Sequence, residues 1–280
     1  MDIFHAIILG IIQGLTEFLP ISSTAHLTVA GKLMGLIDPA HPEDWTAFIA
    51  IIQLGTVSAV IIYFFRDIMQ MITHGTHDLL AKQAGPGRWS IQSRLAWKII
   101  VGTIPVAVIG LLFKKIIEGA ITKELSVIGS SMIGLALILW WAEKIGKRNR
   151  TEEQTSWKDA LIIGFAQAMA LIPGSSRSGT TITAGLFLGL TRETAARFSF
   201  LLSIPAVIAS GLFEIYSARH HFAAIGIVPV IISTIISGVV GYATIAFLLK
   251  YLKTHTTYVF IFYRLALGIA LWWMYLSWNA

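Results

Sequence analysis

The feature that most constrains this chain is a series of long apolar stretches, which leave few polar residues for a water-exposed surface. Eight stretches can be marked, at residues 4–36, 45–65, 96–117, 125–142, 158–190, 198–217, 222–249 and 258–278. The chain is 55% hydrophobic and 13% charged, which is too apolar for a soluble domain of 280 residues. The sequence therefore predicts an all-α integral membrane protein, a polytopic helical bundle in a single domain, residues 1–280.

The distribution of charge indicates topology rather than a nucleic-acid partner. The formal net charge is +6, but the basic residues lie in short loops between apolar stretches. The basic loops at residues 66–98 and 144–158 are assigned to the cytoplasm by the positive-inside rule. The absence of cysteine excludes disulfides, thiolate metal sites and a cysteine nucleophile. The N-terminal residues have no basic segment, so we expect no cleaved signal peptide.

Two apolar stretches are too long for one crossing and are interrupted by proline. Residues 4–36 contain Pro20, and residues 158–190 contain Pro173. A broken helix within a membrane is tolerated where protein or a water-filled cavity satisfies the freed backbone groups. Each stretch is therefore expected to form a re-entrant hairpin of two short helices, and each break is a candidate site.

Internal repetition relates the two interrupted stretches to each other. Gly10 and Gln13 match Gly164 and Gln167. If one residue is dropped, Pro20, Ser22 and Ser23 match Pro173, Ser175 and Ser176. The chain is thus predicted to hold two copies of one unit, at about residues 1–145 and 155–280, each with a hairpin and three spans. Three is an odd number, so the copies form an inverted-topology repeat whose axis brings the hairpins together.

The first broken stretch combines an acid with an imidazole and hydroxyl groups. Gln13 and Glu17 project from one helix face, and the break holds Ser22, Ser23, Thr24 and His26. An ionised carboxylate inside a membrane needs a partner, hydration or a cation. The plainer interpretations are a Glu17 in contact with interfacial water and a His26 that makes only a structural hydrogen bond.

The second broken stretch supplies the opposite charge. Its polar residues are Gly174, Ser175, Ser176, Arg177, Ser178, Gly179, Thr180 and Thr181. A glycine- and serine-rich turn that opens a helix suits phosphate, because unpaired N–H groups and the helix dipole favour an anion. Arg177 can hold phosphate oxygens with two parallel hydrogen bonds. The plainer interpretation is a helix cap with Arg177 extended toward the surface.

These two stretches resemble the signature motifs of the undecaprenyl-pyrophosphate phosphatase family, the bacitracin-resistance type of bacterial membrane enzyme. The resemblance lies in residues 14–26 and 173–181 and extends over most of the chain, including residues 51–56 and the pair Tyr263 and Arg264. It implies removal of the terminal phosphate from the C55 polyprenyl pyrophosphate lipid, which recycles the carrier for cell-wall synthesis. It also implies a multi-pass protein of the bacterial inner membrane that needs a divalent cation, Mg²⁺ or Ca²⁺.

Carried over by position, the resemblance assigns catalytic roles to Glu17, Ser23, His26 and Arg177. It assigns substrate binding to Ser22, Thr24, Gly174, Ser175, Ser176, Ser178 and Thr181. The metal ligands are Gln13 and Glu17, although several family members have Glu where this chain has Gln13, whose amide oxygen can still bind a hard cation. The nucleophile stays open between Ser23, His26 and water.

The resulting prediction is geometric: Glu17, Ser23, His26 and Arg177 should surround one cavity. Arg264, a positive charge within an apolar span, also expects a partner, either the site or Glu214. The alternative function is a polyprenyl-phosphate transporter or flippase on the same inverted-repeat scaffold. Membrane lipids are expected around the protein, and the sequence does not decide whether it forms a homo-oligomer.

Overall fold

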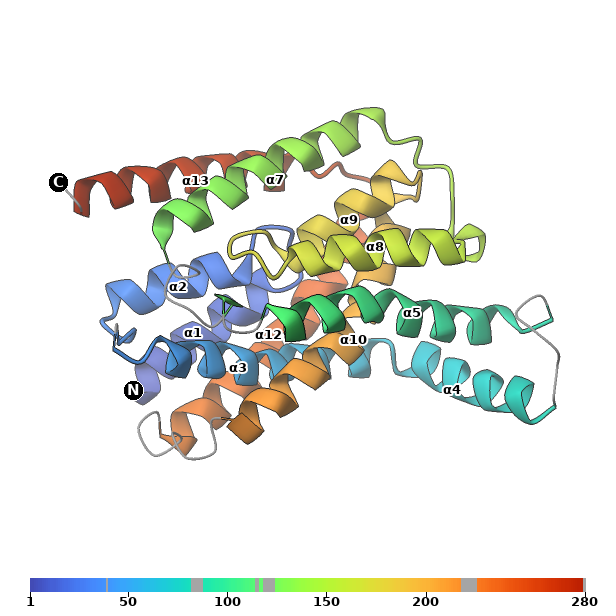
Figure 1. Cartoon of the computed structure of the whole chain (residues 1–280), viewed down its shortest axis with the longest axis horizontal. Coiled ribbons are helices and arrows are strands. Elements are labelled where there is room, and N and C mark those ends of the chain that lie inside the picture. The colour runs from blue at the N-terminus through green and yellow to red at the C-terminus, as the bar shows by residue number, and fades with distance from the viewer. Residues whose placement is uncertain (39, 82–87, 114–115, 118–123, 218–225, 279–280) are drawn as a thin grey trace.

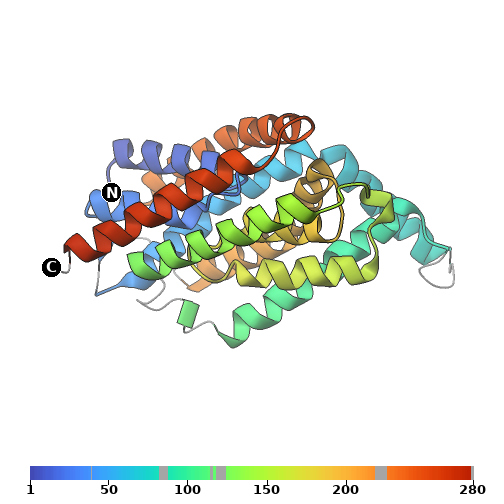
Figure 2. The same ribbon diagram turned by 90° about the horizontal axis from the view of Figure 1, so that it is seen from above.

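The computed structural model describes residues 1–38, 40–81, 88–113, 116–117, 124–217 and 226–278. Throughout these ranges the regular elements are helices, and none is a β-strand. The long helices lie roughly side by side in an elongated bundle, and the two chain termini lie at the same end of it (Figures 1 and 2). The predicted all-α fold is confirmed.

The two interrupted stretches each form a pair of short helices. The first gives α1 (Ile3–Thr16) and α2 (Ser23–Leu33), and the second gives α8 (Trp157–Met169) and α9 (Arg177–Phe187). The longest of the four, α1, has 14 residues. At 1.5 Å per residue it extends about 21 Å, less than the hydrocarbon core of roughly 30 Å. None of the four can cross a membrane alone, as expected for two broken hairpins.

Six of the described helices are long and apolar enough to cross a membrane. They are α3 (Pro42–Tyr63), α5 (Ile91–Leu112), α7 (Leu125–Ile145), α10 (Arg192–Ser217), α12 (Ile227–Leu252) and α13 (Tyr258–Trp278). The helix α4 (Phe65–Leu80) follows α3 and is amphipathic. Together with the hairpins, this composition identifies a multi-pass membrane protein.

Helix contacts pair elements of one half with elements of the other. Helix α1 packs on α12 and α8 packs on α5, while α12 contacts α3 and α5 contacts α10. Glycines permit close approach at these crossings: a Cβ on Gly14 would lie 2.8 Å from the carbonyl oxygen of Ser237. A Cβ on Gly102 would lie 2.9 Å from the carbonyl oxygen of Ala160. The contact of α1 with α12 is equivalent to that of α8 with α5, and the contact of α3 with α12 is equivalent to that of α10 with α5. This equivalence supports a repeat of two units.

The second helices of the two hairpins agree at one constant offset. Helices α2 and α9 begin at residues 23 and 177 and end at 33 and 187, so both offsets are 154 (177 − 23 and 187 − 33). Their N-caps, Ser22 and Ser176, keep the same offset, so Ser176 corresponds to Ser22. The one-residue gap introduced to align the two sequences is not needed at these N-caps. The correspondence of Ser23 with Ser176 drawn from sequence was therefore wrong by one residue. The inverted orientation of the units, and their bounds, stay predictions.

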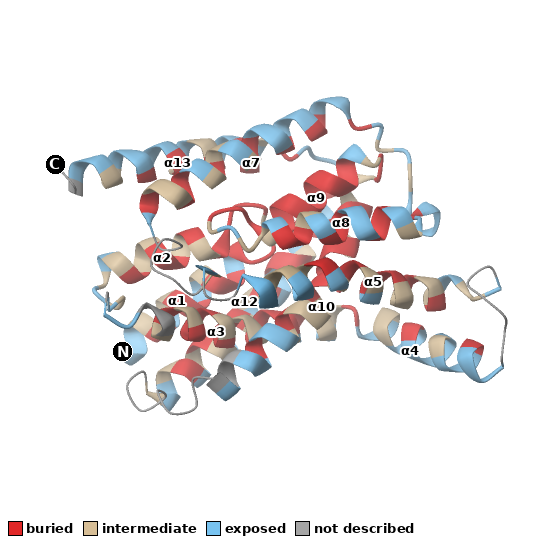
Figure 3. Cartoon of the chain, in the orientation of Figure 1, coloured by how far each residue is buried: buried red, intermediate tan, exposed pale blue. Residues whose placement is uncertain are grey.

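Burial is greatest around the second hairpin. Helix α9 is buried along most of its length, whereas α7 and α13 present exposed apolar faces (Figure 3). At one end of the bundle, Arg197 of α10 binds Asp67 at 3.0 Å and Glu152 at 3.4 Å. These acids belong to the two loops assigned to the cytoplasm, so both loops lie at the same end, as predicted.

Candidate functional site

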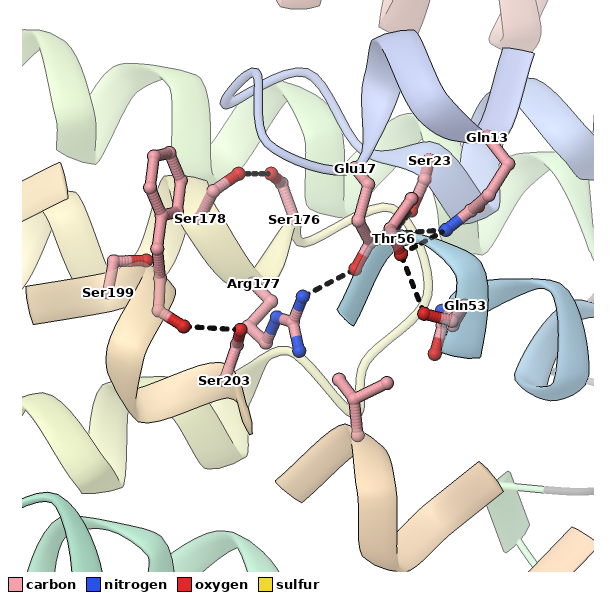
Figure 4. A network of polar contacts seen from close by, with 12 residues as sticks. Gln13, Glu17, Ser23, Gln53, Thr56, Ser176, Arg177, Ser178, Ser199 and Ser203 are labelled. Carbon is pink, nitrogen blue, oxygen red and sulfur yellow. Dashed lines mark hydrogen bonds and ion pairs between the residues drawn. The ribbon is translucent and has the colours of Figure 1, made fainter. Parts of the chain in front are cut away.

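The breaks of the two hairpins meet in the middle of the bundle. Arg177 Nη2 donates a hydrogen bond of 2.5 Å to Glu17 Oε1, and Figure 4 shows the guanidinium pointing at the carboxylate. Ser178 Oγ donates to the carbonyl oxygen of Leu19 at 3.0 Å. The acid and base that the sequence places in different halves are thus in direct contact.

The second oxygen of Glu17 is also occupied. Oε2 accepts hydrogen bonds from Ser23 Oγ at 2.6 Å and from Gln13 Nε2 at 2.8 Å. Gln13 Nε2 also approaches Thr56 Oγ1 of α3 at 3.5 Å. Glu17 is only 6% exposed, and a buried carboxylate is tolerated because both its oxygens have partners. Glu17 therefore links the serine of its own hairpin to the arginine of the other.

The local backbone places Ser23 and Arg177 in equivalent positions. Each is the first residue of a helix, preceded by a serine N-cap with positive φ, 75° at Ser22 and 67° at Ser176. Positive φ at a non-glycine residue costs on the order of 1–3 kcal/mol and is retained where the surroundings fix it. Ser22 and Ser176 Oγ accept from the backbone N–H groups of Ala25 and Gly179. Two helix N-termini, each suited to an anion, thus meet at Glu17.

A cavity of about 590 Å³ opens beside these N-termini. It is lined by seven of the predicted site residues: Glu17, Ser22, Ser23, Thr24, Gly174, Ser176 and Arg177. Helices α5 and α10 contribute apolar side chains to the wall, among them Val106, Leu111 and Val207. The cavity is therefore polar where the hairpins meet and apolar along the spans, which suits a ligand with an anionic head and a hydrocarbon tail.

His26 does not line this cavity. Its Nδ1 lies 2.7 Å from the carbonyl oxygen of Ser22, and its Nε2 lies 2.6 Å from the hydroxyl of Tyr263 in α13, with the rings stacked. A carbonyl oxygen only accepts, so Nδ1 carries the proton and Nε2 accepts from Tyr263. The prediction that four residues surround one cavity holds for Glu17, Ser23 and Arg177 and is wrong for His26.

Three further residues assigned to substrate binding lie outside the cavity lining. Ser178 is bound to Leu19 as described above, and Thr181 Oγ1 contacts the carbonyl oxygen of Arg177 at 2.7 Å and Ser199 Oγ at 2.6 Å. Ser175 is fully buried. The hydroxyl of Ser178 is thus bound to the first hairpin and that of Thr181 to α10. Ser178 and Thr181 hold the second hairpin in place instead of lining the cavity, whereas Ser175 Oγ has no hydrogen-bond partner among the described residues.

Arg264 is the largest fully buried side chain among the described residues. It donates to the carbonyl oxygens of Pro20 at 3.3 Å, Gly174 at 3.2 Å and Ser175 at 2.9 Å. One guanidinium on α13 thus joins the backbones of both breaks. Of the two partners expected for Arg264, the site is confirmed. The side chain of Glu214 is not among the side chains that the structure describes.

The donor set fits a cation held largely by substrate phosphates. The described residues contain no group of three His, Asp or Glu side chains that could form a metal cage. The site has one carboxylate, Glu17, and a buried amide oxygen, Gln13 Oε1, that has no hydrogen-bond partner among the described residues. Mg²⁺ typically uses one or two carboxylates together with phosphate oxygens and water, so Glu17, which lines the cavity, fits as a protein ligand. Gln13 is fully buried and lies outside the cavity lining, and only its unpaired Oε1 fits a cation.

Sequence reasoning missed several polar residues contributed by other helices. Gln53, Thr103 and Gln167 line the cavity, and Thr56 contacts Gln13. The available signals were the match of Gln167 to Gln13 in the repeat and the place of Gln53 within residues 51–56. Thr56 lies in the same segment and shares that signal, whereas Thr103 lies in an apolar span, where threonine is common.

The chain is similar to known proteins over nearly its whole length. Residues 6–270 match the family described as Bacitracin resistance protein BacA. The chain is 53% identical to an undecaprenyl-diphosphatase of Syntrophobacter fumaroxidans, over 98% of both chains. It is 53% identical to one of Chloroherpeton thalassium, over 97% of this chain and 96% of that one. A match over nearly the whole length, by both comparisons, shows that the chain belongs to the bacitracin resistance protein BacA family.

Proposed function

We propose that this protein hydrolyses undecaprenyl diphosphate to the monophosphate and inorganic phosphate in the bacterial inner membrane. The reaction recycles the lipid carrier for cell-wall synthesis and confers resistance to bacitracin. The relatives carry the name of this activity. The observation that supports it most directly is the contact of Glu17 with both Ser23 and Arg177 at the polar end of a cavity with apolar walls.

Arg177 is the principal phosphate ligand in this proposal. The charge of its guanidinium is balanced by Glu17 in a buried ion pair. Phosphate oxygens can replace the carboxylate as partners of the guanidinium and receive two parallel hydrogen bonds. Substrate binding thereby releases Glu17 Oε1 from the arginine. The N–H groups at the start of α9 and the hydroxyl of Ser176 add donors to the same phosphate.

Ser23 is the nucleophile that the geometry favours. Its hydroxyl already donates to Glu17 Oε2, so Glu17 can accept the proton as the bond from Oγ to the terminal phosphorus forms. The bridging P–O bond breaks and undecaprenyl phosphate leaves. Glu17 passes this proton to the leaving undecaprenyl phosphate and then takes a proton from water, whose oxygen attacks the phosphoserine. The P–O bond to Ser23 breaks, Ser23 Oγ takes the proton back from Glu17, and inorganic phosphate leaves. His26 is left without the role of attacking group, because both its ring nitrogens are engaged outside the cavity.

A divalent cation, Mg²⁺ or Ca²⁺, bound by Glu17 and Gln13 would neutralise charge on the pyrophosphate. The remaining stabilisation of the transferring phosphoryl group comes from Arg177 and the helix N-terminus, and phosphoryl transfer depends mainly on such positioning and charge. The apolar wall from α5 and α10 receives the first isoprene units of the tail.

The test is phosphate release by the purified protein in detergent with undecaprenyl diphosphate and Mg²⁺. Glu17→Ala and Arg177→Ala should each lower kcat/KM by about 100-fold or more, since preorganised charge at a transferring phosphate contributes several kcal/mol. Arg66→Ala, a change at an exposed arginine on α4, is the matched control and should retain activity. No release by the wild-type protein would refute the proposal and favour the polyprenyl-phosphate transporter.

A further inference from the structure

Gln167 is a buried polar residue whose side chain has no hydrogen-bond partner among the described residues. It lies in the last turn of α8 and is 1% exposed. Neither its amide oxygen nor its amide nitrogen makes a hydrogen bond within the part of the chain that the structure describes. Because both atoms are unpaired, exchanging the oxygen and nitrogen assignments changes nothing. An unpaired buried polar group costs about 1–3 kcal/mol, so its retention requires an explanation.

The repeat explains why this amide is unpaired. Gln167 lies 154 residues after Gln13 (167 − 13), the offset that relates the two hairpins. Gln13 Nε2 donates to Glu17, four residues further along the chain. The residue four positions after Gln167 is Leu171, which has no acceptor. The second hairpin thus keeps the amide of the first and lacks the carboxylate that binds it.

The unpaired amide belongs to the catalytic cavity. Gln167 lines the same cavity as Glu17, Ser23 and Arg177. Ser23 and Arg177 are both bound to Glu17, so a ligand must displace existing partners to reach them. Gln167 can bind a ligand without breaking a hydrogen bond to any described group. A polar side chain with free N–H donors in a cavity with a positive helix N-terminus suits an oxygen-rich anion.

We infer that Gln167 is a substrate-binding residue whose amide nitrogen donates to a phosphate oxygen of the diphosphate headgroup. This inference rests on the proposed function for the lipid substrate, but the headgroup chemistry is that of any diphosphate. The ligand supplies the acceptor that Leu171 does not, and the cost of the unpaired amide is recovered only when the cavity is filled. Gln167 therefore contributes to affinity and does not contribute to folding.

The opposite demands of folding and binding give a sharp test with Gln167→Leu. Leucine has a similar volume and removes an unpaired polar group, so the thermal unfolding temperature should stay unchanged or rise. Loss of one hydrogen bond to a charged oxygen should raise KM for undecaprenyl diphosphate by roughly 10-fold. The Kd of inorganic pyrophosphate, measured by calorimetry in detergent, should rise by a similar factor. Gln70→Leu, at an exposed position on α4, is the matched control and should change neither constant.

Two further variants test separately the length of the side chain at position 167 and its charge. Gln167→Asn keeps an amide on a shorter side chain and should bind pyrophosphate less tightly than the wild-type protein. Gln167→Glu places a negative charge in the cavity and should weaken binding more than Gln167→Leu does. Both comparisons use the calorimetric Kd, so they do not depend on turnover.

The outcomes distinguish this inference from the proposed function. Wild-type Kd and KM in Gln167→Leu would overturn the inference, as would a lowered unfolding temperature with unchanged Kd, which indicates a structural role. Failure of the wild-type protein to bind pyrophosphate would overturn it as well. If the wild-type protein binds pyrophosphate, Gln167→Leu binds it less tightly and neither hydrolyses the lipid, the inference stands and the proposed hydrolase function fails.

Discussion

Replacement of Arg264 should separate activity from stability. Arg264 contacts no substrate in the proposed mechanism, yet its guanidinium joins the break of the first hairpin at Pro20 to that of the second at Gly174 and Ser175. Arg264→Met removes the donors and keeps an unbranched apolar side chain. The two breaks then lose the side chain that fixes their relative position.

The magnitude follows from two opposing contributions. The bonds of 2.9 and 3.2 Å have ordinary lengths, and hydrogen bonds to charged groups contribute about 1.5–3 kcal/mol each, so their loss costs roughly 3–6 kcal/mol. Removing a fully buried charge recovers several kcal/mol of desolvation. The net loss of stability should therefore be modest, on the order of 0–3 kcal/mol. A displacement of about 1 Å between Ser23 and Arg177 is enough to lower turnover by roughly 100-fold.

The assay compares kcat for phosphate release with the thermal unfolding temperature in the same detergent. Arg264→Met should lose about 100-fold in kcat and remain folded at the assay temperature. Arg264→Lys keeps the charge but cannot span the carbonyl oxygens of Pro20 and Ser175, so an intermediate loss of about 10-fold is expected. Arg66→Met serves as the control. Wild-type turnover in a folded Arg264→Met protein would refute the positioning argument, and so would inactivity that arises only from unfolding.

Other substitutions test single contacts. Ser23→Ala should lower kcat by about 1,000-fold while pyrophosphate binding persists. Acid quenching with labelled substrate should trap phosphoserine in the wild-type protein only. Equal labelling of both proteins would exclude Ser23 as the nucleophile. His26→Phe keeps the stacking on Tyr263 and should cost less than about 10-fold in kcat, in contrast to the roughly 100-fold or larger loss expected of a direct catalytic group. Gly174→Ala should lower the thermal unfolding temperature, because Gly174 has a φ of 83° and a Cβ there would collide with the carbonyl oxygen of Ile128; the strain is about 1–3 kcal/mol before the collision is counted.

The parts of the site that follow from sequence are those under the strongest physical constraint. A carboxylate in an apolar stretch requires a partner, so Glu17 and Arg177 were paired across the two halves of the chain. Proline within a spanning stretch marks a break, and both breaks lie where Pro20 and Pro173 predicted them. Both inferences follow because a membrane disfavours unpaired charges and unsatisfied backbone groups. Neither inference requires knowledge of the direction in which a side chain points.

Side-chain direction was the part that sequence could not supply. Ser22, Ser23, Thr24 and His26 lie close together in the chain, but successive residues of a helix differ by about 100° in direction. The face of α2 on which each side chain lies depends on where the helix starts, and the positive φ of Ser22 fixes that start. Nothing in the residue types predicts that conformation, since positive φ usually favours glycine. His26 consequently faces Tyr263 on α13 and not the cavity.

The offset between α2 and α9 also bears on why Glu17 is the one acid in the cavity lining among the described residues. Ser23 and Arg177 occupy equivalent first positions of α2 and α9, and Glu17 binds both of them through its two oxygens. The equivalent of Glu17 is Leu171 (17 + 154). A second carboxylate there would place like charges around one cavity, which disfavours ionisation of both and competes with phosphate for the single guanidinium. The repeat supplies two anion-favouring helix N-termini, and the loss of symmetry at Leu171 leaves Arg177 free to exchange one carboxylate for a phosphate.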